Sequence, residues 1–89
     1  MSDLDLRGAN LSGANLSLAQ MEANNLSKAN LTGADLTEAT LEGALFDRAN
    51  LTNANLTKAN VQYATMGKAI WSNTTCPDGT VTSTGCPQG

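Results

Sequence analysis

The sequence predicts a square solenoid, in which the chain winds into four-sided coils around a dry interior. Large apolar residues recur every five positions from Leu6 to Trp71, without a break in register. Alanine stands two positions before most of them. Aromatic residues make up only 3% of the chain, too few for an ordinary globular core, so a ladder of leucine and alanine would have to supply the interior.

The apolar residues that recur at this spacing are called the central residues below. There are fourteen: Leu6, Leu11, Leu16, Met21, Leu26, Leu31, Leu36, Leu41, Phe46, Leu51, Leu56, Val61, Met66 and Trp71. Alanine precedes twelve of them by two positions, and the exceptions are Leu4 and Asn24. Such regular internal repetition carries more weight than local propensity.

A period of five fits neither a regular helix nor a flat strand. Five residues advance an α-helix by about 500°, so the apolar residues would spread around the cylinder. On a strand, an odd spacing places successive residues on opposite faces. The pattern stays on one side only if the chain turns a corner once per pentad. Four right-angle corners close a square, which predicts a coil of twenty residues with the apolar positions inside.

Several pentads carry a family resemblance. Residues 8–12 (GANLS), 28–32 (KANLT) and 33–37 (GADLT) resemble the A(D/N)LXX repeat of the pentapeptide-repeat proteins, and the match covers roughly residues 4–71. The resemblance, which extends to the short cyanobacterial members, implies an all-β fold: a right-handed quadrilateral parallel β-helix of about three and a half coils. It implies little about activity, because one fold hosts many functions.

The repeat assigns residues 1–71 to the solenoid. Leu4, in an alanine position at the open first coil, is expected to cover exposed core. Phe46 should stack between Leu26 and Met66 and fill extra volume. Asn24 points inward by register and is expected to be a buried amide that bonds to backbone at a corner.

Asparagine or aspartate often precedes the central residue, where its short side chain can bond nearby backbone and tolerate unusual dihedral angles. These residues, expected at the corners, are Asn10, Asn15, Asn25, Asn30, Asp35, Asn50, Asn55 and Asn60.

Residues 72–89 are predicted to form a C-terminal cap. Pro77-Asp78-Gly79 indicates a turn, and residues 80–82 (TVT) indicate a short strand, so the segment resembles a hairpin over Trp71 and Ile70. Cys76 and Cys86 lie ten residues apart across it and are predicted to form a disulfide, worth about 2–4 kcal/mol. Zinc is the alternative, but it requires four ligands, and without histidine a site would need two chains.

The net charge is −3, which argues against a general nucleic-acid-binding role. No apolar run approaches the length of about 18 residues that spans a membrane. The first five residues are not a secretory signal. The compartment is left open: we expect the periplasm or thylakoid lumen if a leader was removed and the disulfide is stable, and the cytoplasm otherwise. We predict no catalytic residue, no cofactor and no metal, since no cleft, nucleophile with a base, or phosphate loop is indicated.

The outer surface suggests where a partner could bind. Lys28, Arg48 and Lys68 are spaced by twenty and should form one column, with Arg7 near its start and Asp47 beside it. These four basic residues form the expected partner-binding surface and are called the basic wall below; ordinary solvated charge is the alternative. Further columns are predicted from the same spacing: Glu22 with Glu42, Glu38 with Lys58, Ser12 with Thr32 and Thr52, and Ser17 with Thr37 and Thr57.

Two functions are compatible with these features. The first is a non-enzymatic structural or protein-interaction module whose rigid walls present side chains to an unidentified protein partner. The alternative, taken from other members of the resembling family, is a DNA mimic that binds a topoisomerase such as gyrase. Those members are longer and more acidic, whereas this chain has a basic wall. The chain is expected to be a monomer or an end-to-end homodimer, and hydroxyl columns suggest ice binding only by analogy.

Overall fold

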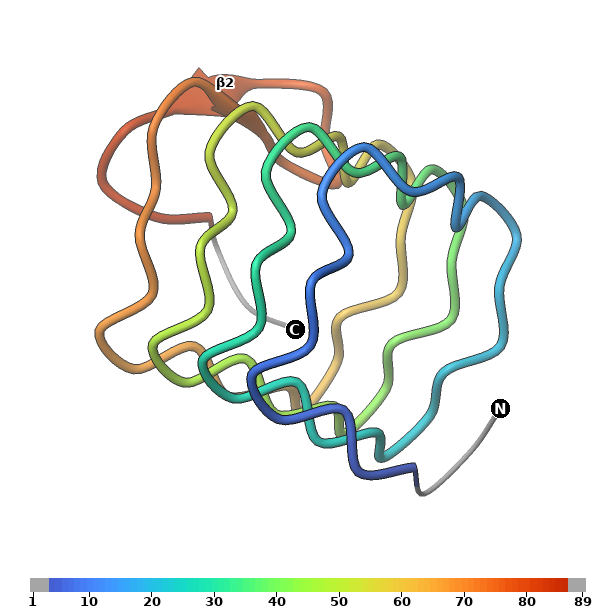
Figure 1. Cartoon of the computed structure of the whole chain (residues 1–89). Coiled ribbons are helices and arrows are strands. Elements are labelled where there is room, and N and C mark those ends of the chain that lie inside the picture. Colours follow the sequence, from blue (N-terminus) through green and yellow to red (C-terminus); the bar gives the residue numbers. More distant parts are fainter. Residues whose placement is uncertain (1–3, 87–89) are drawn as a thin grey trace.

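Parallel backbone pairing between residues twenty positions apart organises the molecule. The structure is a computed structural model that describes residues 4–86; residues 1–3 of the predicted solenoid and 87–89 of the predicted cap lie outside the described residues. Isolated parallel bridges run from Asp5 with Asn25 to Asn55 with Thr75. The chain therefore completes one coil every twenty residues, as predicted, and the coils stack side by side (Figure 1).

The residue before each central residue carries the pairing between coils. The Asn30 N–H donates to the Ala9 carbonyl at 2.8 Å, and the Asn30 carbonyl accepts the Leu11 N–H at 2.8 Å. Both polar groups of this residue therefore point toward the preceding coil. The next coil repeats the arrangement, because the Asn50 N–H donates to the Ala29 carbonyl at 2.9 Å. Backbone groups that would otherwise be buried without partners are satisfied in this way.

Each corner is a tight turn in which the third residue has a positive φ. The carbonyl of Leu6 accepts the N–H of Ala9 at 3.0 Å, and Gly8 between them has a φ of 69°. The same position has positive φ in every pentad, as in a type II turn. Glycine occupies four of these positions, and the other ten hold Leu18, Ala23, Lys28, Glu38, Arg48, Asn53, Lys58, Tyr63, Lys68 and Asn73.

The corner asparagines have a different role from part of the prediction. Their side chains bond nearby backbone, as expected: Asn30 Oδ1 accepts the Thr32 N–H at 3.1 Å. The expectation that they adopt the unusual dihedral angles is wrong, because positive φ falls three residues later, at positions such as Gly33. The asparagine side chain therefore accepts a hydrogen bond from the backbone N–H two residues later, and the left-handed conformation of the turn falls on the residue after that.

The interior is built from the central residues and alanines of the middle coils. Leu31, Leu51 and Phe46 are completely buried, and so are the alanines that precede them by two positions. Fully burying one such leucine is worth about 1.5–3 kcal/mol. Phe46 occupies the wall of Leu26 and Met66, which are also buried, as predicted.

The N-terminal end of the stack is open. Leu6, Leu11 and Leu16 are only partly buried, although they have the same position in the pentad as fully buried leucines above them. Leu4 is 41% exposed, so it covers this end incompletely. Asn24 accepts the Leu4 N–H through Oδ1 at 3.1 Å, as expected of a buried amide. Its Nδ2, however, is buried without a hydrogen-bond partner, so the prediction of a satisfied amide is only half correct.

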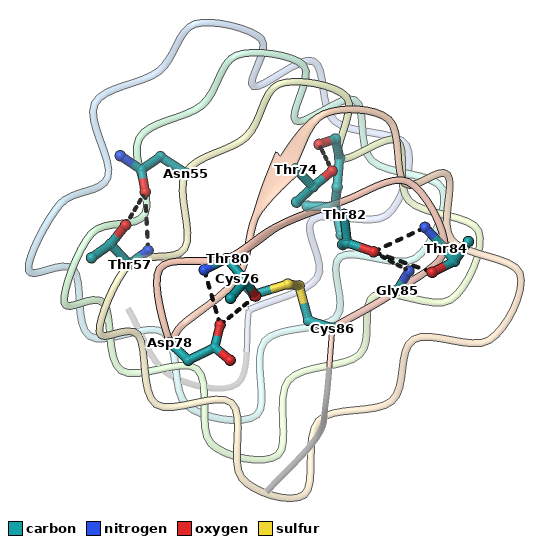
Figure 2. Close-up of a disulfide and its surroundings, with 11 residues drawn as sticks. Asn55, Thr57, Thr74, Cys76, Asp78, Thr80, Thr82, Thr84, Gly85 and Cys86 are labelled. Carbon is teal, nitrogen blue, oxygen red and sulfur yellow. Dashed lines mark hydrogen bonds between the residues drawn. A yellow bond between two sulfur atoms is a disulfide. The ribbon is translucent and has the colours of Figure 1, made fainter.

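The C-terminal end is closed by a hairpin. Strand β1 (Thr74–Thr75) pairs antiparallel with strand β2 (Val81–Thr82). A disulfide joins Cys76 to Cys86 with a Cα–Cα distance of 5.4 Å, as Figure 2 shows. Thr80 lies outside β2, because its N–H is held by Asp78 Oδ1 at 3.1 Å in the turn. The predicted hairpin and disulfide are therefore present, with a shorter strand than expected.

The repeat continues past Trp71, where the sequence prediction ended it. Cys76 lies five residues after Trp71, is 1% exposed and takes the place of a central residue. Thr74 takes the alanine position and donates its buried hydroxyl to the Leu51 carbonyl at 2.7 Å. The Leu56 N–H donates to the Thr75 carbonyl at 2.8 Å, so the stacking reaches the hairpin. Counting five from Trp71 would have found this additional pentad.

The end of the hairpin segment passes over Trp71. A Cβ built on Gly85 would lie 3.5 Å from the indole Nε1, and Gly85 has a φ of 130° that favours glycine. Trp71 is accordingly partly buried beneath this segment. Ile70 is 51% exposed, so the expectation that it also lies beneath the cap is wrong.

Candidate interaction surface

The basic column is built on the left-handed corner position. Lys28, Arg48 and Lys68 each follow a central residue by two positions and have φ values of 62°, 62° and 57°. The Lys28 N–H donates to the Asp47 carbonyl at 2.9 Å, and the Arg48 N–H donates to the Gly67 carbonyl at 2.8 Å, which stacks the three residues on successive coils. All three are exposed. The corner geometry therefore directs their side chains into solvent in one row.

Arg7 stands beside the row, and its charge is compensated. It is one position earlier in its pentad, so Gly8 lies beneath Lys28. Its guanidinium donates to both carboxylate oxygens of Asp5, at 2.9 and 2.8 Å. The side-chain hydrogen bond from Arg7 lowers the pKa of Asp5 to about 2, and the same bond raises the pKa of Arg7. Arg7 consequently adds little uncompensated positive charge to the basic wall.

The basic wall nevertheless differs in charge from the rest of the surface. The basic wall lies on one side of the coil, formed by residues 4–8, 24–28, 44–48 and 64–68 and called the first wall below. This side has four basic and two acidic residues and a net charge of +2. The remaining sequence has one basic and six acidic residues, a net charge of −5. Asp47, the second acidic residue of the wall, uses its Oδ1 to accept the Gly67 N–H at 2.9 Å. A shallow depression lies at the N-terminal end of this wall, lined by Asp5, Arg7, Gly8, Ser27 and Lys28.

The mixed-charge column of Glu38 and Lys58 differs from Arg7 and Asp5, because its side chains form no ion pair. Arg7 and Asp5 form an ion pair in which Nη2 lies 2.8 Å from Oδ2. Glu38 and Lys58 lie on successive coils, since the Glu38 N–H donates to the Thr57 carbonyl at 2.8 Å, but their side chains form no such pair. Lys58 shares the corner position of Arg48 and provides a natural comparison with it.

The hydroxyl columns support the turns. The Thr32 and Thr52 hydroxyls donate to the carboxamide oxygens of Asn30 and Asn50 at 2.7 and 2.6 Å. On the next wall, the Thr37 hydroxyl donates to Asp35 Oδ1 at 2.6 Å and lowers the pKa of that carboxyl. These hydroxyl protons are therefore engaged within their own pentads, which explains the columns as structural features.

The described part of the chain has neither a metal-binding cluster nor a helix that could span a membrane. Residues 4–86 contain no group of three or more His, Cys, Asp or Glu side chains that could hold a metal ion. Over the same residues, no helix is long and apolar enough to span a membrane.

Comparison with known proteins identifies the repeat. The family model described as pentapeptide repeats matches in eight copies, over residues 1–37 and 34–70. Searched against curated proteins, the chain gives no significant match.

Solved structures of pentapeptide repeat proteins are similar to this chain. The pentapeptide repeat protein Rfr23 from the cyanobacterium Cyanothece 51142 is 30% identical with a TM-score of 0.69, covering 78% of this chain and 54% of that one. HetL from Nostoc sp. strain PCC 7120, a pentapeptide repeat protein involved in heterocyst differentiation regulation, is 35% identical with a TM-score of 0.49, covering 91% of this chain and 42% of that one. The chain thus spans about half the length of these relatives.

Proposed function

Because the chain belongs to the pentapeptide-repeat family, we propose that it is a non-enzymatic interaction module whose basic wall binds an acidic protein surface. The observation that carries the proposal is the charge asymmetry: the first wall has a net charge of +2, and the rest of the chain has −5. We also infer that the coil is the right-handed quadrilateral β-helix that the resemblance implies, so that the wall is flat and rigid. A flat wall holds its charges in fixed register, which favours specificity over affinity.

The contact residues of this proposal are Lys28, Arg48 and Lys68, with Arg7 in a supporting position. The three column residues are exposed and lack ion pairs within the described chain, so binding a carboxylate breaks no existing pair. Arg7 would first have to exchange Asp5 for the partner. The disulfide favours an oxidising compartment, for which we propose the periplasm or thylakoid lumen.

A charge-reversal pair tests the wall. Titration with a short oligoglutamate peptide at low salt should show binding that Arg48→Glu weakens at least tenfold and that added salt abolishes. Lys58→Glu is the matched control, because Lys58 is exposed at the same corner position with a φ of 59° and the change in net charge is the same. An equal loss of peptide affinity in both variants would show that only net charge matters, and it would refute the proposal that the basic wall is the binding surface.

A supercoiling assay with gyrase separates this proposal from the alternative of a DNA-mimicking topoisomerase-binding protein. We expect no inhibition, since a DNA mimic needs an extended acidic face and the first wall is basic. Inhibition that survives Arg48→Glu would instead favour the alternative.

A further inference from the structure

The N-terminal end of the stack has unpaired backbone groups arranged in a pattern. In the middle coils, the residue before each central residue directs both its N–H and its carbonyl toward the preceding coil, as Asn30 and Asn50 do. Asn10, Asn15 and Gln20 are the equivalent residues of the first coil. Their N–H and carbonyl groups have no hydrogen-bond partner within the described residues. The open end is therefore an unpaired β edge that runs along three sides of the coil.

The same end combines this edge with apolar surface and little net charge. Leu6, Leu11 and Leu16 are partly exposed there. Across residues 4–20, the charged side chains are Asp5 and Arg7, which neutralise each other through their ion pair. A partner that docks on this end thus needs apolar surface and backbone hydrogen-bonding groups, and it needs no compensating charge.

We infer that the N-terminal end docks on the same end of a second copy of this chain, related by a two-fold axis. A perpendicular two-fold axis makes the facing strands antiparallel. In antiparallel pairing, two opposite residues exchange both N–H···O bonds, which requires each to direct its N–H and carbonyl to the same side. Asn10, Asn15 and Gln20 meet this requirement in both copies. The neutral end of one copy also meets a neutral end, so the contact has no like-charge repulsion.

The opposite end does not present the same surface. There the hairpin of β1 and β2 is joined by the disulfide to the segment that lies over Trp71. The assembly therefore closes as a dimer instead of growing into a filament. One coil is a small interface, so the dimer should be weak and dependent on concentration.

A proline scan with sedimentation velocity tests the inference. Gln20→Pro removes an N–H that is unpaired in the monomer, so the fold should persist while self-association weakens at least tenfold. Glu42→Pro is the matched control in a covered coil: it removes a backbone N–H without a partner at the second turn position, where proline is favoured, and should leave the dimer intact.

Amide hydrogen exchange provides a readout without mutation. The amides of Asn10, Asn15 and Gln20 should become protected as protein concentration rises, while those of Asn30 and Asn50 are protected throughout. A monomer at every concentration would overturn the inference and leave the end to another occupant, such as preceding coils of a longer chain. A dimer that Gln20→Pro does not affect, or larger open assemblies, would overturn it as well.

Discussion

The two ends of the stack are built from the same repeat, but their interiors are covered to different extents. Leu11 and Leu51 occupy the same wall and the same position in the pentad, yet Leu51 is completely buried and Leu11 only partly. The difference arises from neighbours: Leu51 lies between coils, whereas Leu11 has a coil on one side. At the other end, a hairpin and a disulfide replace the missing coil. In a solenoid, a repeat is stabilised by the coils that pack on either side of it, so the coil at each end needs something else to cover its apolar residues.

The largest expected effect separates a covered leucine from an open one. Leu51→Ala should lower the free energy of unfolding by about 2–5 kcal/mol, because it leaves a cavity between two coils. Leu11→Ala should cost less than half as much, because its side chain is already partly exposed. Urea denaturation monitored by circular dichroism measures both, and equal losses would contradict the difference between the ends.

The disulfide should account for the closure of the C-terminal end. Cys86→Ser, or reduction of the wild type, should lower stability by about 2–4 kcal/mol by releasing the closed loop. Because Gly85 lies against the indole of Trp71, the same change should shift Trp71 fluorescence toward longer wavelength. Fluorescence that is unchanged on reduction would show that the segment remains over Trp71 without the disulfide.

The cost of replacing glycine at the corner position should be the same in the open first coil and in a covered coil. Gly13 and Gly33 lie on the first and second coils of one wall with φ values of 68° and 69°, and a Cβ would meet no atom closer than 4.0 Å at either. Gly13→Ala and Gly33→Ala should each cost about 1 kcal/mol, from backbone strain alone. Thermal denaturation of the two variants would reveal unequal costs if neighbours mattered.

The smallest expected effect is a loss of folding stability at low pH. The folded state lowers the pKa of Asp5 to about 2 from an ordinary 3.8, through its hydrogen bonds with Arg7. The contribution of Asp5 to stability is therefore present above the ordinary value and is lost as pH falls toward about 2. Asp5→Asn should flatten the pH dependence of the unfolding midpoint between these values. Asp35→Asn, in a covered coil, should act in the same direction, because Thr37 lowers its pKa.

Most of the coil could be predicted from the sequence, because a single number, the spacing of five, determines which residues share an interior. The spacing of the column Lys28, Arg48 and Lys68 follows from the same number. The corner conformation was harder to predict: glycine occupies four of the positive-φ positions, but residues as different as Leu18, Lys28 and Tyr63 occupy others, so residue type marks the position only in part. Stacking between coils imposes that geometry, whatever residue occupies it.

The remaining differences between prediction and structure arise at residues that depart from the repeat or depend on contacts that the spacing does not determine. Cys76 keeps the register of a central residue but has a different chemical type, so a search for large apolar residues missed it. The compensation of Arg7 by Asp5 depends on a contact within one pentad, which a count of twenty does not reveal. The exposure of Ile70 likewise depends on the path of the hairpin.

Nuclear Overhauser contacts between backbone protons test the twenty-residue coil most directly. The account predicts contacts between residues twenty apart on every wall, including Asn30 with Asn50 and Asp35 with Asn55. Contacts at a different regular spacing, or solvent-exposed side chains at Leu31 and Leu51, would contradict it.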